Sequence, residues 1–371
     1  MKPFEYGDEE IGSRELTFTV SSIIIGTGAL SMPRVIAEQT LFTDGWIILF
    51  LGGLICAVFA WIITKIANLF PNQTFFQYTS AYLSKPIAYG VTGILVLTFA
   101  GITAYQARTI SIIAQTYLFG KTPIELLSFF YLLVVIYGVS GSRVALFRLN
   151  MLFLPIVVSA ILALSLLNIN LMDTRNLLPL FQTKWSQYAI GMKESIFTFI
   201  GFEAVLFYSS IVKQKDKAPL AAAKGVMITN LLYILIYLTC IIVFSNSTTK
   251  NLTYPVIELG KEIEIAGGFL ERFDAIFFTT WIITIFNTTA MYYDISIIGF
   301  RSMFPSIKKK IFIFVSAPII YLLNMLPENV TKVTRYGTYL AWVDMACVII
   351  VPLLVFIIYK IKGGKNSESS S

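Results

Sequence analysis

Long hydrophobic runs separated by short polar segments are the dominant pattern along the chain. A run of about 20 apolar residues is long enough to cross the ~30 Å hydrocarbon core of a bilayer as an α-helix. Glycine and proline positions divide the chain into ten such runs, and we expect ten membrane-spanning helices. Shorter amphipathic helices are expected at 74–83 and 255–265. The predicted spans are residues 14–38, 44–68, 86–118, 123–140, 145–168, 187–212, 219–245, 269–299, 310–326 and 335–360.

Two of these spans are interrupted by glycine near their middle. The first contains Gly26-Thr27-Gly28, and the sixth contains Gly201 followed by the carboxylate of Glu203. An unpaired backbone N–H or C=O costs several kcal/mol in hydrocarbon, so an irregular segment at that depth is tolerated only where protein or a water-filled cavity satisfies it. The two breaks therefore predict a binding site near the bilayer midplane. Close helix packing is the alternative explanation for each glycine.

The positions of the breaks, in the first and sixth of ten spans, predict an inverted repeat. Because five is an odd number, the second half enters the membrane upside down relative to the first, and the broken helices run antiparallel through one site. We expect a single polytopic domain, 1–371. Repeat one covers about 12–168, repeat two covers about 187–360, and 361–371 form a disordered tail.

Composition agrees with this class, and charge adds an orientation. Hydrophobic residues make up 56% of the 371 residues and charged residues 13%. The segment from Glu5 to Glu10 is acidic and no small-residue cleavage site follows the first span, so we expect that span to be retained. Basic residues gather in alternate loops, such as 213–217 and 308–310, and the positive-inside rule then places both termini in the cytoplasm. The net charge of +7 follows from this topology and needs no nucleic-acid partner.

The sequence gives little support for an enzyme. The chain has no histidine, which excludes Ser-His and Cys-His catalysis and histidine metal ligands. Cys56, Cys240 and Cys347 lie far apart in apolar runs, and we expect them to pack rather than to bind a metal. We therefore expect no catalytic residue, no metal and no cofactor, and a membrane enzyme is the least favoured class.

The residues at both breaks resemble a known superfamily. The stretch "IIIGTGALSMP" resembles the first-helix signature of the amino acid–polyamine–organocation superfamily, and "FTFIGFE" is similar to its sixth-helix signature. The segment "KDKAPLAAAKG" resembles the loop before its seventh helix. Within the superfamily, the ten-span chain, its acidic N-terminal segment and the end "VPLLVFIIYKIKGGK" resemble the endospore germination permeases.

This resemblance implies a fold, a role and partners. The fold would be an all-α membrane protein with ten transmembrane helices in a leucine-transporter-like 5+5 inverted repeat. The protein would be the B subunit of a nutrient germinant receptor in the inner membrane of the bacterial spore, acting with an A-type membrane subunit and a C-type lipoprotein. By motif match, the ligand would contact Ile24, Thr27 and Gly28 on the first helix and Phe197, Thr198 and Ile200 on the sixth.

The chemistry of the breaks favours a small amino acid as the ligand. Backbone N–H groups left free by Gly26, Thr27 and Gly28 lie at the start of a half-helix, where the helix dipole also favours a carboxylate. Carbonyl groups from Thr198 to Gly201 offer acceptors to an ammonium group. Neither motif supplies an obvious charged partner for the ligand side chain, so we expect alanine, valine, leucine or proline.

Polar residues inside the spans are further candidates for the cavity. Tyr105, Asn287 and Asp344 belong to this group, because desolvating a polar group in a membrane is costly and is usually retained for a function. Hydrogen bonding between helices explains them equally well. Glu203 would begin the inner half of the sixth span, where capping of the helix N-terminus is an alternative to a cavity role.

Two functions stay open at this point. Some proton-coupled members of the superfamily place a lysine on the fifth helix where others bind sodium, whereas the stretch 150–168 contains no ionisable side chain. A receptor needs only a ligand-biased equilibrium between two conformers, so this departure favours the germinant receptor. The alternative is a secondary amino-acid transporter, coupled to ions or protons.

Overall fold

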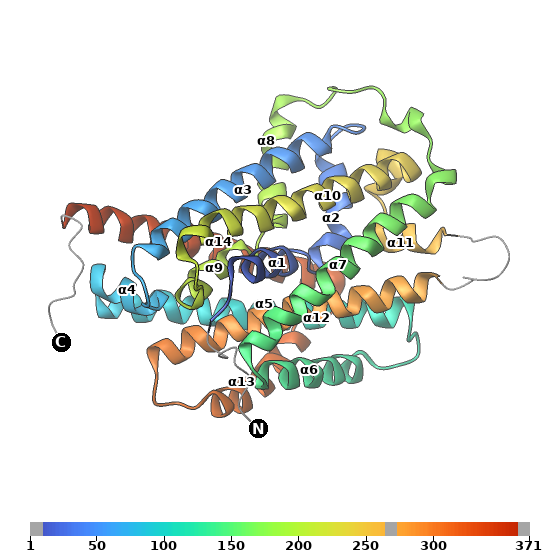
Figure 1. The fold of residues 1–371 in the computed structure, drawn as a ribbon. Coiled ribbons are helices and arrows are strands. Elements are labelled where there is room, and N and C mark those ends of the chain that lie inside the picture. The colour runs from blue at the N-terminus through green and yellow to red at the C-terminus, as the bar shows by residue number, and fades with distance from the viewer. Residues whose placement is uncertain (1–9, 264–272, 363–371) are drawn as a thin grey trace.

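The computed structural model describes residues 10–263 and 273–362, which fold into a bundle of helices (Figure 1). Within these residues there is no β-strand, and a single backbone bridge joins Ile11 to Val212. The α-helices are α1 (Ser13–Ile24), α2 (Gly28–Gln39), α3 (Gly45–Asn68), α4 (Phe75–Tyr82), α5 (Lys85–Tyr117), α6 (Ile124–Ser140), α7 (Arg143–Leu167), α8 (Trp185–Thr198), α9 (Val205–Tyr208), α10 (Ala218–Thr249), α11 (Pro255–Lys261), α12 (Phe273–Met303), α13 (Lys309–Met325) and α14 (Val330–Ile361). The 3-10 turns are η1 (Ile169–Leu171), η2 (Thr174–Leu177), η3 (Phe202–Ala204), η4 (Ser209–Ile211) and η5 (Lys215–Lys217).

Helices occupy all ten segments that the hydrophobic pattern predicts. Among the described residues, five helices are long and apolar enough to cross a membrane, and the bent pair α1 and α2 makes a sixth. The protein is therefore a multi-pass membrane protein, with fewer clear spans by length and hydropathy than the ten predicted. One reason is that α6 and α13 have only 17 residues each, slightly short of the ~20 that a perpendicular crossing needs.

The shorter predicted elements and the helix ends also agree closely with the structure. Thr74 caps the N-terminus of α4, and its hydroxyl and backbone N–H exchange hydrogen bonds with Gln77 in a capping box. The regular part of α10 ends at Ser245 (φ 66°, ψ 164°), the predicted end of the seventh span. The helix predicted at 255–265 is α11, which ends at Lys261, four residues before the predicted end. The start of the predicted eighth span and the predicted tail beyond Lys362 lie outside the described residues.

The helices form two groups, with α1 in the middle of the bundle (Figure 1). In one group α3 packs against α10 and α8, and in the other α5 packs against α12, α6 and α13. α1 contacts α10 of the first group and α12 of the second, and it also contacts α7. This arrangement brings the end of α1, where the chain leaves regular helix, to the centre of the protein.

Large apolar side chains cover the outside of the bundle. Leu97 is 72% exposed, Phe130 62% and Phe314 82%. Exposed apolar side chains on this scale mark a surface that contacts a membrane or another protein. On a multi-pass membrane protein this apolar surface faces lipid. Polar side chains therefore lie mainly inside the bundle.

Candidate ligand-binding site

The first helix break lies between Ile24, the last residue of α1, and Gly28, the first residue of α2. The two helices are bent by 60° at this point. The carbonyl groups at the end of α1 are satisfied by neighbouring helices: Tyr233 Oη donates to Ile24 O at 2.8 Å, and Thr288 Oγ1 donates to Ile25 O at 3.1 Å. The predicted break is confirmed, and its acceptors are already paired within the protein.

The donors at the start of α2 are only partly paired. Thr27 N donates to Gln106 Oε1 at 3.2 Å, and the Thr27 hydroxyl donates to the same oxygen. A Cβ at Gly26 would lie 2.5 Å from Gln106 Nε2, so a glycine is needed to let this side chain approach. Gln106, on α5, is a site residue that the sequence analysis missed. The sequence contains a signal for Gln106, because it is a polar residue inside an apolar span and next to Tyr105.

Gly28 differs from its neighbours in being open. Its backbone is exposed, a Cβ built on it would meet no atom within 4 Å, and its N–H donates to none of the described residues. The amide therefore lies free at the N-terminal end of α2, where the helix dipole adds partial positive charge. This is the geometry that binds a carboxylate.

The second break separates α8, which ends at Thr198, from the short turns that begin at Phe202. Gly201 has a φ of 128°, and a Cβ there would lie 2.9 Å from Ile23 Cγ2 and 3.1 Å from Ile24 N. The two breaks are therefore in direct contact. Glu203 Oε2 accepts a hydrogen bond of 2.6 Å from Gly201 N, the capping contact that the sequence analysis offered as one explanation of this carboxylate.

A cavity of about 210 Å³ lies where the two breaks meet. Its walls also include Gln106 and Tyr292, and the side of α14 at Thr334, Gly337 and Thr338. The predicted residues that line it are Ile24, Gly26, Thr27, Gly28, Tyr105, Phe197, Thr198 and Ile200.

Four predicted residues lie outside the lining of this cavity. Gly201 packs against α1 and is not among the residues that line the cavity, so its role at a ligand site stays a prediction. Asn287 is buried on α12 and only 4% exposed. Glu203 and Asp344 are fully buried behind the cavity, with 0% exposure. The lengths of the spans and the spacing of polar residues along the chain do not distinguish residues that line a cavity from residues packed behind them.

A smaller cavity of about 50 Å³ adjoins the first and shares Thr27, Ser31 and Tyr105 with it. It continues to Arg34 on α2 and to Tyr254 at the start of α11. The shared residues place the two cavities side by side along α2.

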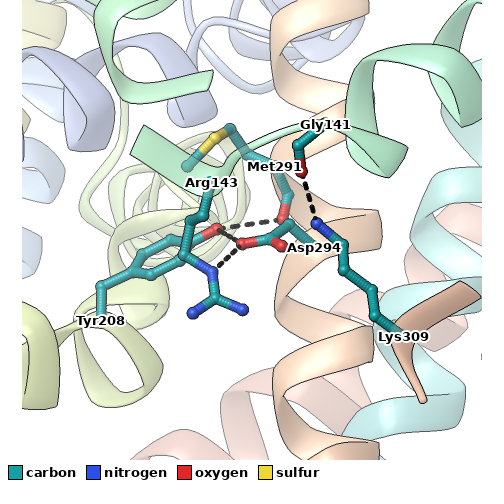
Figure 2. A network of polar contacts seen from close by, with 6 residues as sticks. All are labelled: Gly141, Arg143, Tyr208, Met291, Asp294 and Lys309. Atoms are coloured by element: carbon teal, nitrogen blue, oxygen red, sulfur yellow. Dashed lines mark hydrogen bonds and ion pairs between the residues drawn. The ribbon is translucent and has the colours of Figure 1, made fainter. Parts of the chain in front are cut away.

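An ion pair with a fully buried carboxylate joins α7 to α12 outside the lining of this cavity (Figure 2). Arg143 Nε, at the start of α7, donates to Asp294 Oδ2 on α12 at 2.8 Å. Tyr208 on α9 donates to the same oxygen at 3.3 Å. Lys309, at the start of α13, lies beside this group and donates to Gly141 O at 2.8 Å. The contacts of Asp294 join α7, α9 and α12, and the separate bond of Lys309 joins the start of α13 to Gly141 at the end of α6.

Comparison with known proteins agrees with this geometry. A family model described as spore germination protein, a permease family, matches residues 10–333. The chain belongs to this family. The resemblance to the endospore germination permeases, which rests on the ten-span chain, its acidic N-terminal segment and its C-terminal stretch, is thereby confirmed.

Relatives within the family match nine tenths or more of the chain. Spore germination protein GerLB of Bacillus cereus is 68% identical over 374 residues and covers 100% of both chains. Spore germination protein A2 of Bacillus subtilis is 26% identical over 344 residues, covering 92% of this chain and 93% of its own. Spore germination protein B2 of Bacillus subtilis is 25% identical over 339 residues, covering 91% of this chain and 92% of its own.

Solved transporter structures share the fold. MHP1, a nucleobase-cation-symport-1 family transporter, matches 99% of this chain and 82% of its own with a TM-score of 0.71 at 12% identity. A Na⁺-coupled sialic acid symporter in its outward-open state matches 93% of this chain and 80% of its own with a TM-score of 0.64 at 13% identity. At these identities the likeness shows a transporter-like fold.

Proposed function

We propose that this protein is the integral-membrane B subunit of a spore nutrient germinant receptor, and that it binds a small amino acid between the two helix breaks. The observation that supports the proposal most directly is the open backbone at both breaks beside one cavity. Gly28 offers a free N–H to a carboxylate. At the second break, the carbonyls of Thr198 and Ile200, which belong to the same lining, accept no hydrogen bond from the described residues and are available to an ammonium group.

The size and the walls of the cavity support an amino acid with a small apolar side chain. At about 210 Å³ it exceeds the ~150 Å³ of an engineered apolar cavity that holds benzene. Met32, Val35 and Ile102 provide apolar contact surface. Glu194, the carboxylate in the lining, lies 3.9 Å from Lys193 in an ion pair on the same helix, so it is not left as an unpaired anion for a cationic ligand.

The membrane arrangement that goes with this function is ten spans in a 5+5 inverted repeat. Two helix contacts support it: α3 packs against α10, and α5 packs against α12, so the second and third spans of one half pair with those of the other. In this proposal the single domain lies in the inner membrane of the spore with both termini on the cytoplasmic side. Its partners are membrane lipid, an A-type membrane subunit and a C-type lipoprotein.

Cysteine accessibility mapping tests this arrangement. Single cysteines in the loop at 213–217, introduced into a chain without native cysteines, should react only with reagents that reach the cytoplasmic side. Cysteines at 121 and 250, in loops that the proposal places outside, are the matched comparison. Labelling of the 213–217 loop by an impermeant reagent added from outside would contradict the topology.

Gly28→Ala is expected to weaken the response to ligand while leaving the fold intact. The new methyl group meets no protein atom within 4 Å, so it projects into the space where the carboxylate would bind. Loss of one hydrogen bond costs roughly 0.5–1.5 kcal/mol, which corresponds to a severalfold higher ligand concentration at half-maximal response. The measurement is a dose-response curve for germination of spores that carry the variant.

The matched control for this experiment is Gly93→Ala. Gly93 lies on α5 outside the cavity lining, and a Cβ there also meets no atom within 4 Å. The control should leave the midpoint of the dose-response curve unchanged at the same protein level. Equal midpoints for the two variants would argue against a carboxylate site at Gly28.

A secondary amino-acid transporter is the second candidate, because the fold is similar to that of two cation-coupled transporters. The two functions differ in what the isolated chain does in proteoliposomes. A receptor subunit should bind an amino acid without concentrating it, and its response in spores should depend on the partner subunits. Saturable concentrative uptake by the chain alone would place the transporter first.

A further inference from the structure

Two carboxylates, Glu203 and Asp344, meet in the interior of the protein behind the ligand cavity. Both side chains are fully buried, with 0% exposure, and they interact directly with each other. Glu203 belongs to the second helix break, and Asp344 belongs to α14. They are 141 residues apart, which is the difference between their numbers.

The two carboxylates have different hydrogen-bond partners. Glu203 Oε2 accepts from Gly201 N at 2.6 Å, and Glu203 Oε1 accepts from the Tyr292 hydroxyl at 3.4 Å. Both oxygens of Asp344 are buried and accept no hydrogen bond from the described residues. A carboxylate group in that position has no donor to stabilise a negative charge, whereas Glu203 has two.

The surroundings of the pair offer no compensating positive charge. The titratable groups that face it are Tyr292 on α12, Cys56 on α3 and Cys347 on α14. Tyr233 on α10 faces Tyr292 in turn. No lysine or arginine of the described part of the chain forms an ion pair with either carboxylate.

Two adjacent negative charges in such a site are strongly unfavourable. Each charge loses its hydration, and the two charges repel each other through a medium of low dielectric constant. A single proton removes both costs, because a protonated Asp344 becomes the donor for Glu203 while Glu203 keeps its contacts with Gly201 N and Tyr292. Paired carboxylates that share one proton are a recognised arrangement in proteins.

We propose that Glu203 and Asp344 form a proton-binding site, and that Tyr292 links its occupancy to the ligand cavity. The Tyr292 side chain lines that cavity and reaches Glu203. In the bound state, which rests on the proposed function, the ammonium group of the amino acid lies at the carbonyls of Thr198 and Ile200, beside this pair. Its positive charge favours the fully ionised pair, so ligand binding releases the proton.

The first test uses the purified full chain without ligand. At neutral pH its infrared spectrum should contain the carbonyl band of a protonated carboxylic acid, and Asp344→Asn should remove this band. The matched control is Glu328→Gln, which changes a carboxylate whose side chain is 75% exposed and should leave the band in place. Asparagine at 344 can still donate a hydrogen bond to Glu203, so the variant retains the contact.

Three outcomes would overturn the proton site. Absence of the acid band from the wild-type spectrum would mean that both carboxylates are ionised. A band that survives in the double variant Glu203→Gln and Asp344→Asn would belong to another residue. A band that appears only after Na⁺ and K⁺ are removed would mean that the pair holds a monovalent cation.

The second test measures the link to ligand. The heat of binding of L-alanine, L-valine, L-leucine and L-proline is measured in two buffers of different ionisation enthalpy. We expect release of up to about one proton per ligand bound, and therefore tighter binding as pH rises, by up to about tenfold per pH unit. Asp344→Asn should release none.

The two tests separate the proposals. An acid band that depends on Asp344, with no binding of any of these amino acids, supports the proton site and contradicts the proposed ligand. Binding without proton release in the wild-type chain overturns the link through Tyr292.

Discussion

Replacing Gly201 with leucine is expected to destabilise the protein by several kcal/mol. The residue has a φ of 128°, a conformation that costs of order 1–3 kcal/mol for a residue with a side chain. The first atom of any side chain would also lie 2.9 Å from Ile23 Cγ2, 3.1 Å from Ile24 N and 3.2 Å from Ile23 C. Two of these are backbone atoms of α1, which cannot move away without displacing the first helix break.

The measurement is the thermal unfolding midpoint and the yield of monodisperse protein for the purified full chain. Gly201→Ala should show part of the loss, because it introduces the strained backbone and the close Cβ without the rest of the side chain. Gly93→Leu is the control, since that position on α5 has open space around it. An unfolding midpoint for Gly201→Leu equal to that of the wild type would contradict the close contact between the two breaks.

The sequence alone supports a different expectation for the effect of Gly201→Leu. From the sequence alone, Gly201 is a cavity residue, and a bulky substitution there should abolish the response to ligand with little effect on folding. The structure places the residue against the backbone of α1 and outside the lining. The same glycine pattern predicts both situations, because a missing side chain serves equally to open a cavity and to admit a neighbouring helix.

The helix breaks themselves could be predicted from the sequence, because they depend on local composition. Glycine in the middle of an apolar run lowers the cost of leaving the helix, although Gly52, Gly53 and Gly93 lie inside unbroken helices. Both interruptions are found within a few residues of the predicted positions. Helix positions are equally local, since they follow from runs of apolar residues and from caps such as Thr74. These features need no knowledge of which segments meet in space.

Pairings across the fold could not be predicted in this way. Gln106 is 79 residues from Thr27, and Arg143 is 151 residues from Asp294. A polar side chain inside a span indicates that a partner exists, but its spacing along the chain does not identify the partner. Glu203 and Asp344 are likewise far apart in the sequence, so the contact between these carboxylates could not be predicted from it.

The ion pair of Arg143 with the buried Asp294 is the basis of the second large prediction. The two charges differ in their access to water, because the Asp294 side chain is 0% exposed and the Arg143 side chain is 25% exposed. Arg143→Met leaves a buried carboxylate without its cation, a change that typically costs about 3–5 kcal/mol. Asp294→Asn leaves a cation that can still be partly hydrated, and it keeps an acceptor for the Tyr208 hydroxyl, so we expect a smaller loss.

The double variant tests whether the charge itself causes the loss. Arg143→Met combined with Asp294→Asn removes both charges, and it should be more stable than Arg143→Met alone, because no uncompensated charge remains. Arg175→Met is the control, since its pairing with Asp173 in an exposed loop should contribute little. The readout is the thermal unfolding midpoint of each purified full-length chain. A double variant less stable than Arg143→Met would show that Asp294 stabilises the fold independently of Arg143, through groups such as Lys309 that lie beside it in Figure 2.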